Sequence, residues 1–158
     1  MEARRVVTGH DANGRAIVLE DEVLQGPPQM APGIEPLPLW TTAGFPVSND
    51  GATDTKDDVA GITKPKGTVF TLVKFGPGNT PLPHRTNSID YGIIVSGEID
   101  MELDDGQLVH LKAGDVLVQR GTIHNWVNRG TEPCVLAAII IDSKPVTAAG
   151  KVLEATIA

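Results

Sequence analysis

The sequence predicts an all-β domain, built as a barrel or a sandwich of short strands. Strand-like apolar runs recur about every 8 to 12 residues with turn signals between them. The chain contains 17 glycines and 12 prolines, which is many for a helical protein and typical of strands joined by turns. No amphipathic helix of useful length precedes the tail, which excludes an alternation of strands and helices. The 158 residues are enough for one domain with its own core.

Residues 1–66 are predicted to form a hairpin, an arm and a loop that pack on the barrel. Residues 4–20 predict a β-hairpin, since Asn13-Gly14 favours positive φ in the turn between its strand-like runs. Several prolines at residues 21–38 block a helix and a central strand, so we expect an arm that crosses the surface.

A short strand at residues 37–42 follows the arm. The polar segment 45–66 is rich in Asp, Gly and Thr, and it predicts a mobile loop or a lid. Together with Trp40, this segment is the candidate cover for the mouth of the barrel.

Residues 67–143 are predicted to form the barrel itself. The alternation of Ile99, Met101 and Leu103 with two acidic residues is typical of a half-buried strand. The expected strands are residues 68–75, 93–95, 99–103, 108–111, 116–119, 124–127 and 134–141. The tail at residues 144–158 is compatible with a short helix or a strand.

Composition excludes several classes of function. The formal net charge is −7, from 20 acidic and 13 basic residues, whereas nucleic-acid binders and binders of anionic membranes need a basic face. The one cysteine, Cys134, lies in an apolar run and is expected to be a small buried hydrophobe. No apolar run approaches the length of about 18 residues that spans a membrane, and the N-terminus lacks the apolar region of a signal peptide. We therefore expect a cytoplasmic protein with no nucleic-acid or membrane partner.

Two histidines and an aspartate are the candidate functional residues. His84 and Thr86 lie two positions apart in a strand and face the same way, and Asp90 has the same parity if the strand continues. His124 comes from a later strand. Two imidazoles and one carboxylate are a ligand set for a divalent transition metal with open positions, whether Fe, Mn, Ni or Zn.

Two motifs in residues 67–143 resemble those of the cupins, a family of small double-stranded β-helix or jelly-roll barrels. The first motif runs His84-Arg85-Thr86, three residues, Asp90, six residues and Gly97. The resemblance implies a jelly-roll barrel, here with an N-terminal strand extension, and a metal held by His84, Asp90 and His124.

The second motif runs Gly114-Asp115, then Gly121, two residues, His124, three residues and Asn128. The chain departs from the family pattern in both motifs. Thr86 replaces a histidine, Asp90 replaces a glutamate, and Arg120-Gly121 replaces a proline-containing run. One imidazole is thereby lost, and a water is expected in its place. A metal-free cupin with a polar, hydrogen-bonded cluster is the alternative.

A pocket in such a barrel suits a small, partly apolar molecule. We expect a metal-dependent enzyme acting on a small organic acid, a keto-enol or a phenol, with Asp90 and His124 as catalytic residues. A dioxygenase, decarboxylase, dehydratase or isomerase would fit equally. The alternatives are a non-catalytic binding protein and a metal-free acid/base enzyme. The pocket is expected to include Thr86, Trp126, Gln119, Trp40 and Tyr91. Pairing of such barrels predicts a homodimer.

Overall fold

The computed structural model describes residues 1–50, 55–56, 58 and 61–157, and the fold is all-β. In chain order the strands are β1 (Glu2–His10), β2 (Ala16–Gln25), β3 (Ile34–Ala43), β4 (Gly67–Phe75), β5 (His84–Arg85), β6 (Ser88–Ser96), β7 (Glu98–Glu102), β8 (Leu108–Lys112), β9 (Val116–Arg120), β10 (Asn125–Val127), β11 (Cys134–Asp142), β12 (Val146–Ala148), β13 (Lys151–Leu153) and β14 (Thr156–Ile157). Within these ranges the one helical element is the 3₁₀ turn η1 (Asp104–Gly106). None of the described residues belongs to a helix long and apolar enough to cross a membrane.

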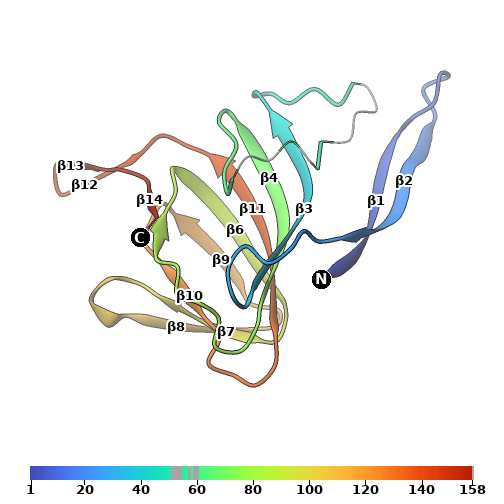
Figure 1. Cartoon of the computed structure of the whole chain (residues 1–158). Coiled ribbons are helices and arrows are strands. Elements are labelled where there is room, and N and C mark those ends of the chain that lie inside the picture. The colour runs from blue at the N-terminus through green and yellow to red at the C-terminus, as the bar shows by residue number, and fades with distance from the viewer. Residues whose placement is uncertain (51–54, 57, 59–60, 158) are drawn as a thin grey trace.

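Two antiparallel sheets form the barrel. One has the strand order β3-β4-β11-β6-β9, and the other has the order β10-β7-β8. The larger sheet curves over the smaller one, and the chain crosses between them repeatedly (Figure 1). The buried core between them is Ile34, Phe75, Ile94, Ile99, Met101, Leu111, Trp126, Cys134 and Leu136. Cys134 is fully buried, and burial raises the pKa of its thiol to about 11, which confirms an inert packing role.

The expected arm is partly a strand. Residues 34–43 form β3, which contains both Pro36 and Pro38 and pairs with β4. Proline cannot donate a ladder hydrogen bond, but β3 lies at the edge of the five-stranded sheet, where one side needs no partner. The register also shifts between Pro38 and Trp40, as expected for a bulge. The segment before residue 67 therefore contributes a strand to the barrel.

The N-terminal hairpin is confirmed and is longer than expected. β1 and β2 pair with each other and with none of the other described strands, and the hairpin extends away from the barrel (Figure 1). Its base is fixed by Arg5, whose Nη1 donates to the carbonyl of Leu39 at 2.9 Å and whose guanidinium lies over Trp40. The expected lid at residues 45–66 includes positions outside the described residues.

The tail forms strands. β12 pairs with β13, and β14 pairs with β5, matching Thr156 with Arg85 and Ile157 with His84. The end of the chain therefore lies beside the strand that carries the first candidate histidine (Figure 1).

Candidate functional site

The structure brings His84 and His124 together. The two residues form an isolated antiparallel bridge, in which the backbone N–H of each donates to the carbonyl of the other at 2.9 and 3.0 Å. A directly opposed pair in an antiparallel bridge projects its side chains to the same face. The ring centroids of the two imidazoles are accordingly 4.1 Å apart.

Both imidazoles are held in the same tautomer. His84 Nδ1 lies 2.8 Å from the carbonyl oxygen of Leu82, and His124 Nδ1 lies 3.1 Å from that of Thr122. A carbonyl oxygen only accepts, so each Nδ1 must carry the proton and donate it. In the described part of the chain neither Nε2 has a hydrogen-bond partner. Each neutral ring therefore has a free lone pair at Nε2.

His124 is held in its neutral form. Its side chain is buried, and desolvation, followed by the charge of His84, lowers its pKa to about 4. Near neutral pH His124 Nε2 is thus an acceptor for a proton or a hydrogen bond.

Asp90 is a buried carboxyl group on β6. Its Oδ1 is buried and has no hydrogen-bond partner among the described residues. Desolvation raises the pKa of Asp90, against the opposing effects of a hydrogen bond from Ser88 and the charge of His84. Ser88 also lies 2.7 Å from Thr86, oxygen to oxygen. Thr86 is therefore bonded to a protein hydroxyl.

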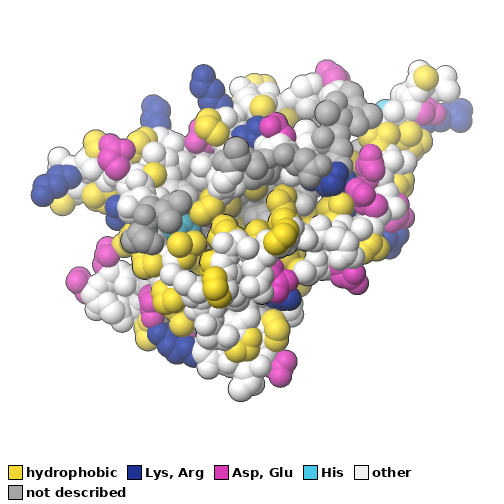
Figure 2. Space-filling model, viewed as in Figure 1, with side chains coloured by type: hydrophobic (Ala, Val, Ile, Leu, Met, Phe, Trp, Pro, Cys, Tyr) yellow, Lys and Arg dark blue, Asp and Glu magenta, His cyan; other side chains and the backbone are white. Residues whose placement is uncertain are grey.

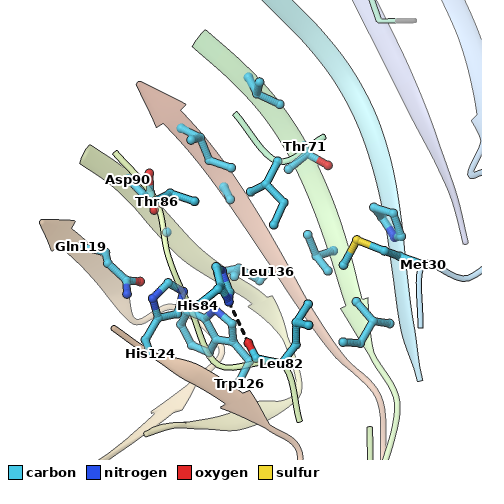
Figure 3. A pocket seen from close by; sticks show the side chains of 18 of the residues that line it. Met30, Thr71, Leu82, His84, Thr86, Asp90, Gln119, His124, Trp126 and Leu136 are labelled. Carbon is cyan, nitrogen blue, oxygen red and sulfur yellow. Dashed lines mark hydrogen bonds between the residues drawn. The ribbon is translucent and has the colours of Figure 1, made fainter. Parts of the chain in front are cut away.

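The side chains do not fit the three-ligand metal site expected from the sequence. Among the described residues, no three His, Cys, Asp or Glu side chains gather so that they could hold a metal ion. Asp90 lies beside Thr86, apart from the paired imidazoles of His84 and His124 (Figure 3). The aspartate is one methylene shorter than the glutamate of the family pattern, and the hydrogen bond from Ser88 holds it where it is. Two imidazoles alone leave a metal without a protein carboxylate.

The candidate residues line one pocket, with a volume of about 270 Å³. Thr86, Gln119 and Trp126 line it as predicted, together with His84, Asp90 and His124. Its other walls are Met30, Ile34, Pro36, Pro38, Gly61, Ile62, Val69, Thr71, Val73, Phe75, Leu82, Gly92, Leu117, Asn125, Leu136, Ala138 and Ile140. His124 meets Trp126 edge to face, with centroids 5.8 Å apart. The pocket is thus an apolar cavity with a few polar groups, as small-molecule sites usually are.

Two predicted pocket residues lie elsewhere, which corrects the expectation. Tyr91 follows Asp90 in β6 and, by the alternation of a strand, points outward, where it is 44% exposed. Trp40 contacts Arg5 and lines a separate hollow between the hairpin and β3. Trp40 therefore does not cover the mouth of the site pocket.

Sequence reasoning missed the asparagines that hold the site in place. Asn125 Oδ1 accepts the backbone N–H of Leu82 at 2.8 Å, and Leu82 in turn accepts the proton of His84 Nδ1. Asn128, the last residue of the second motif, is 1% exposed and donates to the carbonyls of Phe75 and Glu132. These roles are structural, and only the motif position of Asn128 pointed to one of them.

The depressed pKa of His124 predicts a loss of stability in acid. The folded state binds its proton only near pH 4, whereas an unfolded histidine does so near pH 6.5. The stabilisation is therefore complete above about pH 6.5 and is lost as the pH falls toward about 4. As the pH falls through this range, wild type should lose about 3 kcal/mol of unfolding free energy relative to His124→Phe, which has no imidazole at this position to protonate. Urea titrations of both proteins measure it, and parallel pH profiles would contradict it.

The pairing of β14 with β5 predicts that the tail stabilises the strand of His84. Deleting residues 155–158 removes the partner of β5, so the free energy of unfolding should fall by about 1 kcal/mol or more as these backbone hydrogen bonds are lost. Thr156→Ala is the matched control, because it keeps the backbone pairing and should keep the stability. Equal free energies of unfolding for the truncated and the full chain, measured by urea titration, would show that the tail has no such role.

Comparison with known proteins agrees with this geometry. The family model described as "Cupin domain" matches residues 71–141. Phomopsin biosynthesis cluster protein C′ of Diaporthe leptostromiformis is 37% identical over 157 residues, covering 94% of this chain and 83% of that protein. The cupin-domain-containing oxidoreductase fogC of Aspergillus ruber is 32% identical over 161 residues, covering 95% and 77%. The polyketide cyclase RemF of Streptomyces resistomycificus superposes with a TM-score of 0.53 at 19% identity, over 78% of this chain and 77% of that one, a likeness of fold.

Proposed function

We propose that this chain, which belongs to the cupin superfamily, is an enzyme that catalyses proton transfer on a small molecule through its own side chains. The observation that carries the proposal is the imidazole pair, in which both Nδ1 atoms are bound to backbone carbonyls and neither Nε2 atom has a hydrogen-bond partner among the described residues. The buried carboxyl of Asp90, whose pKa is raised, supports it in the same pocket. The reaction class is isomerisation or dehydration, which needs no oxidant.

In this proposal the imidazole pair acts as the base and Asp90 acts as the acid. His124 Nε2, helped by His84, takes a proton from a carbon next to a carbonyl group, and the electron pair of the broken C–H bond moves to form the enol. Asp90, whose pKa is raised by burial, donates its proton to the carbonyl oxygen. The imidazole pair then gives its proton to another carbon in an isomerisation, or to a hydroxyl group that leaves as water in a dehydration. The enol O–H returns its proton to Asp90 as the carbonyl group reforms.

A substrate panel tests this function. Ketones, β-diketones and acylphenols are incubated with the protein in deuterium oxide, and nuclear magnetic resonance follows exchange of their α-protons and the products formed. The proposal expects catalysed exchange for at least one compound. Binding without exchange or product, across the panel, would instead indicate a non-catalytic binding protein.

An oxidoreductase is the second candidate, and the name of the relative fogC favours it. That protein is called a cupin-domain-containing oxidoreductase and is 32% identical to this chain. A redox reaction would need a cofactor or a metal beyond the side chains of the pocket. The same panel, with Fe, Mn, Ni or Zn added under air, separates the two: an oxidised product formed only with metal supports the second candidate.

We also propose that the protein is a homodimer, paired through the outer face of its larger sheet. This face exposes apolar side chains from β4, β6 and β9: Phe70, Tyr91, Ile93, Val95, Val116 and Val118. A continuous exposed apolar surface of this kind commonly marks a protein interface.

Substitution on this face tests the dimer. Wild type should scatter light as a dimer at micromolar concentration, and Val116→Lys with Val118→Lys should give a monomer, because charges would be buried without partners. Val152→Lys, on the similarly exposed β13, is the control and should stay dimeric. A wild-type mass equal to one chain would contradict the proposal.

A further inference from the structure

The pocket offers no cationic side chain to a ligand. Among the described residues that line it, none is Lys or Arg, and the titratable ones are His84, Asp90 and His124. Asp90 is itself an acid, so a ligand carboxylate would meet a second carboxyl group in the same cavity. A bound anion would lose its hydration there without gaining a fixed positive charge.

The cations next to pocket residues in sequence lie outside the lining. Arg85 follows His84, and its Nε donates to the carbonyl of Gly121 at 3.1 Å. Lys74 lies between two lining residues and is paired with Glu35 at 2.7 Å. Arg120, which follows Gln119, is exposed.

The polar groups of the pocket gather on one side. Asp90 and Thr86 lie on one wall, with Gln119 and the imidazoles below them, and Met30 lies across the cavity (Figure 3). Gln119 donates from Nε2 to Thr122 Oγ1 at 3.2 Å, and the described residues leave its Oε1 without a partner. This wall therefore presents donors and acceptors that match a carbonyl or a hydroxyl group.

Apolar side chains make up most of the remaining lining, and the pocket continues to the surface at Met30. Met30 is 50% exposed. On the face drawn in Figure 2, hydrophobic side chains gather around the middle of the molecule. A hydrocarbon body fits against this wall, where a charged group would not.

We infer that the ligand of this pocket is an uncharged molecule, with a carbonyl, enol or phenol group toward Asp90 and Gln119 and a hydrocarbon body toward Met30. The inference rests on the proposed function for what the imidazoles do to that polar group. Of the substrate classes expected from the sequence, it keeps the keto-enols and the phenols and rejects the small organic acids.

A matched pair of ligands tests the inference. para-Butylbenzaldehyde and para-butylbenzoate share a hydrocarbon body and differ at the polar end, which is neutral in one and ionised in the other near neutral pH. Calorimetry on the whole chain should show the aldehyde binding at least about tenfold more tightly. Asp90→Asn, which removes the carboxyl group that would face the ligand carboxylate, should strengthen benzoate binding by about tenfold. Glu132→Gln removes an exposed carboxylate outside the pocket and is the control, which should leave the preference unchanged.

The outcomes separate this inference from the proposed function. Equal or tighter binding of the benzoate by wild type would overturn the inference and leave the proton-transfer proposal standing. Failure of both compounds to bind at millimolar concentration would overturn it as well. Variants of His84 and His124 could keep the full rate of proton exchange and the preference for the aldehyde. This result would contradict the proposed function and support the inference.

Discussion

Replacing His124 by phenylalanine is expected to lower the rate of catalysed proton exchange by about 10²- to 10⁴-fold, the usual contribution of a general base. Phenylalanine keeps a ring against Trp126 but has no Nε2 to accept a proton. Exchange of the α-protons of the best panel substrate, followed by nuclear magnetic resonance, measures the effect. His10→Phe is the matched control, because His10 is exposed at the end of β1, and it should retain the full rate.

The partner histidine sharpens this test. His84→Phe should cost a similar factor, because its imidazole lies against that of His124, with ring centroids 4.1 Å apart. If the pair is one functional unit, the double variant should be no slower than the slower single variant. If the rate losses of the two single variants multiply in the double variant, the imidazoles act independently. A loss of less than about threefold in each single variant would show that the pair has no part in the mechanism.

Asp90→Asn should lower the exchange rate by about 10²-fold or more while making the protein more stable near neutral pH. Asparagine cannot donate an acidic proton, so the rate falls. Burial raises the pKa of Asp90, which means that the ionised carboxylate is disfavoured in the folded state. A raised pKa stabilises the folded state only below the pKa of the unfolded chain, and that contribution is lost as the pH rises. Replacing this carboxyl group should therefore raise the free energy of unfolding near neutral pH.

The control for this prediction is to measure the stability of both proteins at low pH. Below the unfolded-state pKa of about 3.9 the carboxyl group is protonated in both states, so the stabilisation by Asp90→Asn should vanish there. Glu132→Gln, at an exposed position, should change neither rate nor stability. Urea titrations at several pH values measure the difference. An Asp90→Asn protein that is less stable than wild type near neutral pH would show that the carboxylate is stabilising.

Alternation of side chains predicted most of the barrel and the inward positions of its site. The strands from residue 67 onward follow the apolar pattern, and His84, Thr86 and Asp90 all line the pocket. The strand is not continuous between them, because β5 ends at Arg85 and β6 begins at Ser88. The cupin resemblance paired this segment with His124, which no local pattern could have done.

Other features were set by contacts distant in sequence. Pro36 and Pro38 argue against a central strand, but they do not show that β3 lies at the edge of a sheet. The pairing of β14 with β5 joins residues about 70 positions apart, and Trp40 depends on Arg5 of the hairpin. The sequence position of Asp90 predicted that it lies in the pocket. It could not show that its short side chain, which accepts a hydrogen bond from Ser88, stays apart from the imidazoles.

The most direct test of the account is whether the protein's own side chains suffice for proton transfer. Protein purified without a histidine tag is treated with a chelator, its metal content is measured by mass spectrometry, and proton exchange is measured on the same sample. The account predicts an unchanged rate with less than about one metal ion per ten chains, because His84, His124 and Asp90 supply the base and the acid. A rate that falls with the metal content and returns when Fe, Mn, Ni or Zn is added would contradict it.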